Sequence, residues 1–249
     1  MSGLKMSNSV FIQTQNVRNV LMMMEDIQMD TGEGCFGMIC GGAGLGKSEA
    51  AKWYYANHPN TVYLPSTWIW RSSELEFLRD LCRELGIENV GNRKGRCYRD
   101  IMDYLFENRD AVIFIDEVDR LKNGHLELMR DFTKASLCPF ILIGERKLIP
   151  FMQPNERGWT LTFDPVMFSP MKHSDVIIFA KEAAGVKINA DVAAILHKTG
   201  TKNTSDGNFR LVKRAVQYAI QYANAKNSDV ITPEIAGAAI KSAIHWAKK

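Results

Sequence analysis

One glycine-rich run between an apolar segment and a helical segment constrains the fold most. It consists of Gly41, Gly42, Ala43, Gly44, Leu45, Gly46, Lys47 and Ser48, and it fits the pattern G-x-x-x-x-G-K-[ST]. Glycines allow backbone conformations that a Cβ forbids, so successive N–H groups can point at phosphate oxygens. Residues 36–40 predict a strand before the run, and residues 49–56 predict a helix after it. The positive N-terminal end of such a helix faces the phosphates, so the run predicts a site for a nucleoside triphosphate.

Specific contacts follow from this pattern. Lys47 supplies a positive charge to the β- and γ-phosphates, and Ser48 offers its hydroxyl to Mg²⁺. We therefore expect ATP and Mg²⁺ as ligands, with the nucleotide held by residues 41–48 and by Glu49, which follows them in the first turn of the helix.

A second pattern places two carboxylates after an apolar run. Residues 111–115 are apolar and rich in β-branched side chains, as expected of a strand covered on both faces, and Asp116 and Glu117 follow directly. Ligands of α/β sheets bind at the carboxyl ends of the strands. We predict that Asp116 binds Mg²⁺ and that Glu117 activates the attacking water as a general base. The alternative is a pair of acids at an ordinary turn, and the glycine-rich run upstream favours the catalytic interpretation.

Composition limits the class of protein. The chain has 249 residues, 46% hydrophobic residues and a net charge of +3, so it can bury a core and is only mildly basic. Its five cysteines are an odd number without a C-x-x-C pair, which argues against a disulfide framework or a zinc site and favours a reducing cytoplasm. No apolar run is long enough for a membrane span, and we expect no membrane partner.

The order of elements predicts an α/β fold. Strand candidates at residues 60–64 and 139–143 alternate with helix candidates at 75–85, 97–108 and 126–134, which implies a parallel sheet. After residue 171 only helices are expected, and they lie at residues 174–184, 190–198, 209–225 and 233–248. We predict a P-loop NTPase core at residues 31–170, an N-terminal segment with one helix at 1–30, and a small helical lid at 171–249.

The two carboxylates, the helices after the sheet and the run Gly207-Asn208-Phe209-Arg210 together resemble the AAA+ ATPases. The resemblance implies that Arg210 reaches the γ-phosphate within its own subunit. It also implies an arginine that reaches the nucleotide of a neighbouring subunit, for which Arg157 and Arg146 compete. The family usually has a neutral polar residue after the fourth strand, where this chain has Glu145. An acid there repels the γ-phosphate unless Arg146 or Lys147 pairs with it, so we expect slow hydrolysis.

More particular segments resemble the phage Mu B transposition protein family. They lie at residues 11–17, 46–52, 84–86, 93–95 and 115–121. This resemblance implies a protein that assembles with ATP on double-stranded DNA as a ring or filament, marks target DNA and delivers it to a transposase that stimulates hydrolysis. For a phage protein the location is the bacterial cytoplasm. The helix-turn-helix domain that begins the Mu protein is expected to be missing from this chain.

Two segments are candidates for DNA contact. Arg93, Lys94, Arg96 and Arg99 cluster around two glycines, which suits contact with backbone phosphates, although Asp100 and Asp103 dilute the charge. The alternative is a solvated loop leading into a helix. Thr67 and Trp68 lie in a second loop, where Trp68 and Trp70 either stack on DNA or belong to the core or a subunit interface. No base-reading helix is visible, so we expect binding without sequence preference.

Three functions remain open at this stage. The first is an ATP-gated DNA-binding oligomer that serves a transposase, the second is a protein-remodelling ATPase without DNA, and the third is a replication initiator or helicase loader. ATP-dependent retention of DNA separates the second from the other two. Stimulation by a transposase separates the first from the third.

Overall fold

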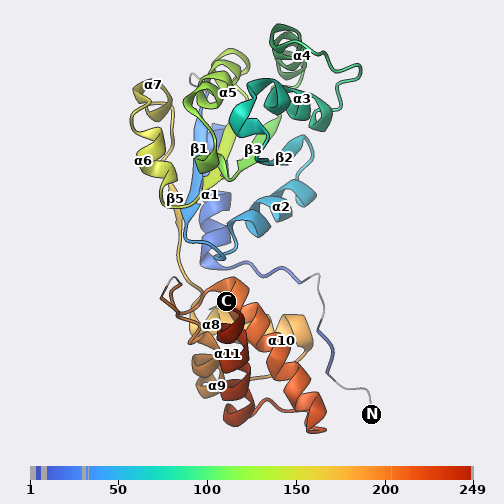
Figure 1. The fold of residues 1–249 in the computed structure, drawn as a ribbon, viewed down its shortest axis with the longest axis vertical. Helices are drawn as coiled ribbons and strands as arrows, with labels where there is room; N and C mark the ends of the chain where they lie inside the picture. The colour runs from blue at the N-terminus through green and yellow to red at the C-terminus, as the bar shows by residue number, and fades with distance from the viewer. Residues whose placement is uncertain (1–3, 7–9, 30–31, 33, 203, 248–249) are drawn as a thin grey trace. The chain divides into compact units, whose positions relative to one another are not determined.

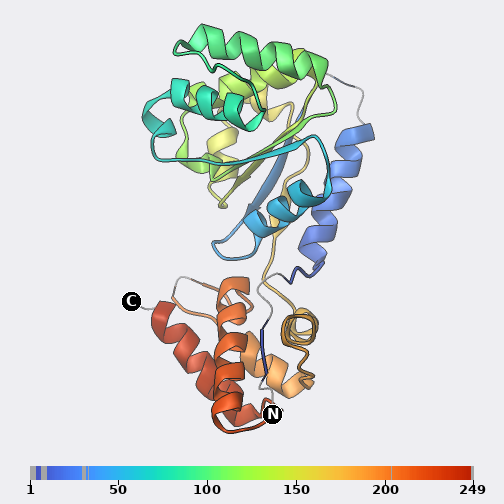
Figure 2. The same cartoon turned by 90° about the vertical axis from the view of Figure 1, so that its right-hand side faces the viewer.

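The computed structural model describes residues 4–6, 10–29, 32, 34–202 and 204–247, which form two compact units (Figures 1 and 2). The sheet unit comprises residues 17–41 and 47–167, and the helical unit comprises residues 1–16, 42–46 and 168–249. The predicted boundaries at residues 30 and 170 stay a prediction.

A parallel sheet forms the centre of the sheet unit. The five strands lie in the order β2-β3-β4-β1-β5, and β2 pairs with β3, β3 with β4 and β4 with β1 in parallel. Their bounds are β1 Phe36–Gly41, β2 Thr61–Pro65, β3 Val112–Asp116, β4 Phe140–Gly144 and β5 Val166–Phe168. The predicted α/β class with a parallel sheet is confirmed. The strand β5 was not predicted, because three residues are too few to show a pattern.

Helices cover both faces of this sheet. Phe36, Met38 and Cys40 of β1 pack into a core built largely from the helices after β2, β3 and β4. Gly37, between them, faces Met23 and Ile27 of the first helix instead. The helices of the unit are α1 Gln15–Met29, α2 Lys47–Asn57, α3 Glu74–Glu84, α4 Lys94–Glu107, α5 Asn123–Ser136, α6 Leu148–Met152 and α7 Glu156–Trp159. The alternation along β1 explains why a strand buried on both faces reads as a continuous apolar run.

One expectation in this unit needs correction and one open alternative is decided. The helix expected from residue 97 begins at Lys94, so Lys94 and Arg96 lie in the first turns of α4 and not in a loop. The helix tolerates Gly95, and Arg96 pairs with Asp100 one turn later. Of the alternatives left open for Trp70, the structure favours the core, because Trp70 is 1% exposed and its Nε1–H donates to Asp80 Oδ2 at 2.8 Å.

The helical unit holds its own core. Its helices are α8 His173–Ala184, α9 Ala190–His197, α10 Phe209–Ala225 and α11 Pro233–Ala247, which confirms the predicted run of helices (Figure 1). Side-chain oxygens of Asn189, Asn208 and Thr232 accept backbone N–H bonds at three of the helix starts. Leu4 joins this unit through paired bonds with the side chain of Asn224 in α10, at 2.8 Å each.

The cysteines and the helices bear on two further expectations. Cys40 and Cys138 are buried core residues, as predicted, and Cys35, Cys82 and Cys97 are buried free thiols as well. Among the described residues, no helix is both long and apolar enough to cross a membrane.

Candidate functional site

The glycine-rich run joins β1 to α2, so strand, loop and helix follow one another as predicted. Gly44 has a φ of +75° and Gly46 a φ of +98°, conformations that residues with a Cβ rarely adopt. Lys47 begins α2 and is 9% exposed, and its Nζ donates to the carbonyl oxygen of Gly41 at 2.9 Å. The loop therefore curls back on itself, with its lysine drawn to the end of β1.

Burial and nearby acids act against each other on Lys47. Burial lowers the pKa of its ammonium group, and the charges of Asp116, Glu145 and Asp119 partly offset that shift. These three acids come from the segments that follow β3 and β4. They share the carboxyl edge of the sheet with Lys47, which is the edge where ligands of such sheets bind.

Asp116 is held at both carboxylate oxygens. It ends β3 and is 5% exposed. Its Oδ1 accepts the N–H of Glu117 at 2.8 Å, and its Oδ2 accepts the hydroxyl of Tyr63 at 2.7 Å. A carboxylate has about four lone-pair positions, so these two bonds leave room for further donors or a hydrated cation.

Glu117 adopts an unusual backbone conformation. Its φ of +57° and ψ of +37° are left-handed, and its carbonyl oxygen accepts the hydroxyl of Ser66 at 3.0 Å. Its half-exposed carboxylate pairs with Arg120 at 2.5 Å. Left-handed residues other than glycine cluster at functional sites, where surrounding contacts hold them in place. The carboxylate of Glu117 therefore has a different partner, Arg120, from the carboxylate of its chain neighbour Asp116, which bonds to Tyr63.

Glu145 directly follows β4 and is exposed. Its backbone N–H donates to Asp119 Oδ1 at 3.2 Å, and Lys147 Nζ lies 2.8 Å from Asp119 Oδ2. The ion-pair partner of Lys147 is therefore Asp119, and not Glu145 as the sequence had suggested. Asp119 joins the turn after β3 to the turn after β4.

Magnesium suits these residues only together with a phosphate. Among the described residues, no group of three or more His, Cys, Asp or Glu side chains could hold a metal ion. Protein sites for Mg²⁺ commonly supply one or two carboxylates and leave the other positions to waters and substrate phosphates. Asp116, with lone pairs left over, and the hydroxyl of Ser48 fit that donor set.

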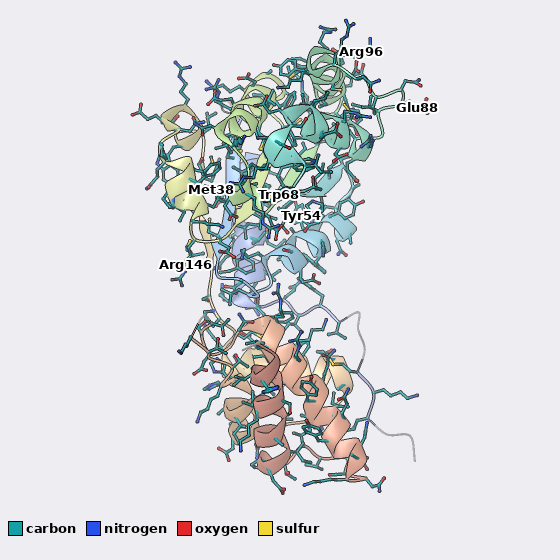
Figure 3. All side chains as sticks on the ribbon, viewed as in Figure 1. Met38, Tyr54, Trp68, Glu88, Arg96 and Arg146 are labelled. Atoms are coloured by element: carbon teal, nitrogen blue, oxygen red, sulfur yellow. The ribbon has the colours of Figure 1, made fainter. Side chains whose placement is uncertain are left out.

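The three candidate arginines lie in different settings. Arg157, in α7, lines an open polar pocket of about 320 Å³ with Asn123, Glu127, Arg130 and residues 154–156. Arg146 is exposed in the turn after β4, and Figure 3 shows it far from Arg96. Arg210 lies in the first turn of α10. Within the helical unit its backbone N–H donates to Gly44 O at 3.0 Å, and Asn208 Nδ2 donates to Ala43 O at 2.8 Å. The catalytic roles of the three arginines stay predictions.

The basic cluster is partly neutralised. Lys94 Nζ lies 2.7 Å from Glu74 Oε2, and Arg96 Nε lies 2.8 Å from Asp100 Oδ1. Arg93 and Arg99 form no ion pair within the described part of the chain, so they are the cations available to a polyanion.

Trp68 belongs to a second, separate surface. It is 77% exposed beside exposed Thr67, and the Arg71 guanidinium lies 5.1 Å from the centre of its ring. Figure 3 shows Trp68 well separated from Arg96.

Two residues at the site escaped the sequence analysis. Asp119 could have been suspected from its place just after Asp116 and Glu117. Tyr63 is harder to suspect from the sequence, because its place beside Asp116 depends on how β2 pairs with β3. In that register Tyr63 lies opposite Phe114, and Asp116 is two residues further along the same face.

The chain is similar to a known protein family and to named phage proteins. Residues 30–152 match the protein-family model described as an AAA domain. The ATP-dependent target DNA activator B of Escherichia phage Mu is 27% identical over 228 residues, covering 88% of this chain and 69% of that protein. The Mu-like prophage FluMu DNA transposition protein B of Haemophilus influenzae is 29% identical over 143 residues, covering 57% of this chain and 48% of that protein.

Solved structures support the fold. Cdc6p of Pyrobaculum aerophilum matches with a TM-score of 0.70 at 16% identity, covering 96% of this chain and 70% of that one. The ORC1 protein of Aeropyrum pernix, solved in complex with DNA, matches with a TM-score of 0.61 at 16% identity, covering 91% of this chain and 64% of that one. These matches confirm the predicted AAA+ fold.

Proposed function

Because this chain is an AAA+ ATPase of the family of the phage Mu target DNA activator B, we propose that it is an ATP-dependent DNA-binding protein of DNA transposition. It assembles on double-stranded DNA with ATP and delivers that DNA to a transposase. The observation that carries the proposal is the buried pair of Lys47 and Asp116 at the carboxyl edge of the sheet, in a chain whose relatives are named for target DNA and transposition.

The nucleotide chemistry follows from the site. The backbone of residues 41–46 and the ammonium of Lys47 bind the phosphates, with Glu49 at the start of the helix that follows. When bound, Mg²⁺ neutralises developing charge on the phosphates, and Ser48 and Asp116 are its protein ligands. Glu117 takes a proton from the water that attacks the γ-phosphorus, and ADP leaves with the phosphoryl oxygen that it had shared. The Arg120 ion pair and the charge of Glu145 keep this turnover slow.

The arginines make the nucleotide a link between subunits in this proposal. Arg210 reads the γ-phosphate within its own chain, and Arg157 reaches the nucleotide of the neighbouring chain. An arginine supplied in trans contributes about 10³–10⁵ to the rate in related nucleotidases. A ligand stabilises the state that binds it best, so ATP favours the assembled form and hydrolysis releases it.

DNA binding is assigned to phosphate contacts. Arg93 and Arg99 contact the backbone directly, and Lys94 and Arg96 exchange their carboxylate partners for phosphates. Thr67 and Trp68 supply a second contact, with the Trp68 ring stacking or wedging between bases. Each phosphate contact steepens the dependence of log binding constant on log salt by about 0.9 for duplex DNA.

A replication initiator or helicase loader is the second candidate, because the solved structures that share this fold include Cdc6p and a DNA-bound ORC1 protein. A protein-remodelling ATPase without DNA is the third. Stimulation of hydrolysis by a transposase favours the first candidate over the second, and ATP-dependent retention of duplex DNA excludes the third.

The variant Glu117→Gln tests the proposal most directly. A general base contributes about 10²–10⁴ to a rate, so we expect turnover to fall by that factor while ATP binding persists. Protein–DNA assemblies seen by electron microscopy should then last longer with ATP, and resemble those formed with a non-hydrolysable analogue. Glu107→Gln, at an exposed position near the end of α4, is the matched control and should behave as wild type.

The double variant Arg93→Gln with Arg99→Gln tests the proposed DNA contacts. It should reduce the steepness of the dependence of log DNA-binding constant on log salt by about 2 for every DNA sequence tested, and leave ATP binding unchanged. Unchanged ATP turnover in Glu117→Gln would refute the role of Glu117 as general base. DNA binding by the wild type that does not depend on ATP would refute the proposal that ATP controls assembly.

A further inference from the structure

Tyr63 lies beside the carboxylate expected to bind magnesium. It stands on β2 opposite Phe114 of β3, and Pro65, two residues later, stands opposite Asp116. Side chains two residues apart share a face of the sheet, so the long Tyr63 side chain reaches along the strand to Asp116. Its hydroxyl donates to Asp116 Oδ2 at 2.7 Å.

Tyr63 also lies beside the other expected magnesium ligand, the hydroxyl of Ser48 at the start of α2. A phenol has an ordinary pKa of about 10, so the Tyr63 hydroxyl is protonated at neutral pH and can donate. Lys52, one turn after Ser48 in α2, places its Nζ 5.9 Å from the ring centre. The phenol thus joins β2, β3 and the start of α2.

The carboxylate of Asp116 is fixed by this arrangement. The Glu117 N–H holds Oδ1 and Tyr63 holds Oδ2, so the plane of the carboxylate cannot turn without breaking one of the two bonds. We propose that Tyr63 is a positioning residue that orients Asp116 and Ser48 for Mg²⁺ bound with ATP. This inference rests on the proposed nucleotide function and assigns a role to a residue outside the phosphate loop and the acidic pair.

The expected size of the effect comes from metal sites in general. Residues that orient metal ligands without touching the metal change metal affinity by about 10–100-fold when they are replaced. Tyr63 bonds to Asp116 and lies beside Ser48, the two expected magnesium ligands, so its effect should appear in the Mg²⁺ dependence and not in binding of the nucleotide alone.

Tyr63→Phe removes the hydroxyl and keeps the ring. The measurement is equilibrium binding of a fluorescent ATP analogue over a Mg²⁺ titration, without DNA, with a parallel series in EDTA. We expect the Mg²⁺ concentration for half-maximal binding to rise about 10–100-fold, while binding in EDTA stays at the wild-type level. Tyr54→Phe, which removes the hydroxyl of a buried tyrosine in α2, is the matched control and should leave both series unchanged.

Two results would overturn the inference. One is a wild-type Mg²⁺ titration in Tyr63→Phe, and the other is an equal loss of binding with Mg²⁺ and in EDTA, which signifies damage to the fold. A wild-type protein that binds no nucleotide at all would overturn both this inference and the proposed function. A protein that binds Mg²⁺ and nucleotide but ignores DNA would overturn only the latter.

Discussion

The charges at the carboxyl edge of the sheet and those at the start of α4 are held in opposite ways. Lys47 and Asp116 are buried, their opposite charges act on each other, and hydrogen bonds to a backbone carbonyl, a backbone N–H and a phenol hold them in place. Lys94 is exposed and paired with the carboxylate of Glu74, and Arg96 is exposed and paired with Asp100. Buried hydrogen bonds fix the direction of a charge, whereas exposed ion pairs leave the side chains free to exchange partners.

The difference teaches what each region suits. Burying a charge costs free energy unless hydrogen bonds and opposite charges compensate for it, and such fixed partners hold it in one direction, so the sheet edge suits one ligand in one geometry. Exposed ion pairs contribute about 0–1 kcal/mol and exchange readily, so the start of α4 suits any polyanion that offers many phosphates.

Replacing a lysine in each region is the sharpest way to break this comparison. Lys47→Ala should lower the rate of ATP hydrolysis by about 10²–10³, because it removes a preorganised charge from a water-poor site. Lys94→Ala should leave ATP hydrolysis at the wild-type rate and weaken DNA binding only slightly. Steady-state ATPase assays and DNA titrations at fixed salt measure the two effects. Equal losses of ATP hydrolysis in the two variants would contradict the distinction between the buried sheet edge and the exposed start of α4.

The two tryptophans after β2 sharpen the comparison between buried and exposed groups. Trp70→Ala should destabilise the protein by about 3–5 kcal/mol, because it empties a core position and removes the indole donor from Asp80 Oδ2. Trp68→Ala should change the free energy of unfolding by no more than about 0.5 kcal/mol, since the side chain is exposed. Urea denaturation measures both. A loss of DNA binding in Trp68→Ala at unchanged stability would support the assigned contact.

We expect the smallest effect from the buried histidine His125, on the pH dependence of the free energy of unfolding. It is 1% exposed, and burial lowers the pKa of its imidazole. Between the ordinary histidine pKa of about 6.5 and the lower folded value, the unfolded chain binds more protons than the folded chain. Stability should therefore fall as the pH drops through this window. Unfolding free energies at pH 7.5 and 5.5 should differ less in His125→Phe than in wild type; an equal difference would contradict the assignment.

The sequence predicted the parts of the site that depend on local spacing. Gly41 ends one strand and Lys47 follows it, and Asp116 ends another strand that Glu117 follows, so the order of strand, loop and helix was enough to bring them to one edge. The register that brings Tyr63 to Asp116 depends on how β2 pairs with β3, which no single segment contains.

Long-range partners account for the rest. The Lys94–Glu74 pair joins two helices, and the Lys147–Asp119 pair joins the turns after two strands. Both partners in each case look like ordinary surface charges in the sequence. The start of α4 was misplaced for a related reason, because Gly95 normally weakens a helix by about 1 kcal/mol and the contacts that compensate for it come from elsewhere in the fold.

The parallel pairing of β1 with β4 also bears on how the chain folds during synthesis. Phe36 pairs with Phe140, so β1 emerges from the ribosome long before the strand beside it. Contacts between distant residues slow folding, because a long loop must close before they form. We expect nascent chains that stop before residue 140 to lack nucleotide affinity and to expose an apolar strand edge that chaperones or other chains can bind. The ability to bind ATP would then arise late in synthesis, because it depends on the nearly complete sheet and not on the glycine-rich loop alone.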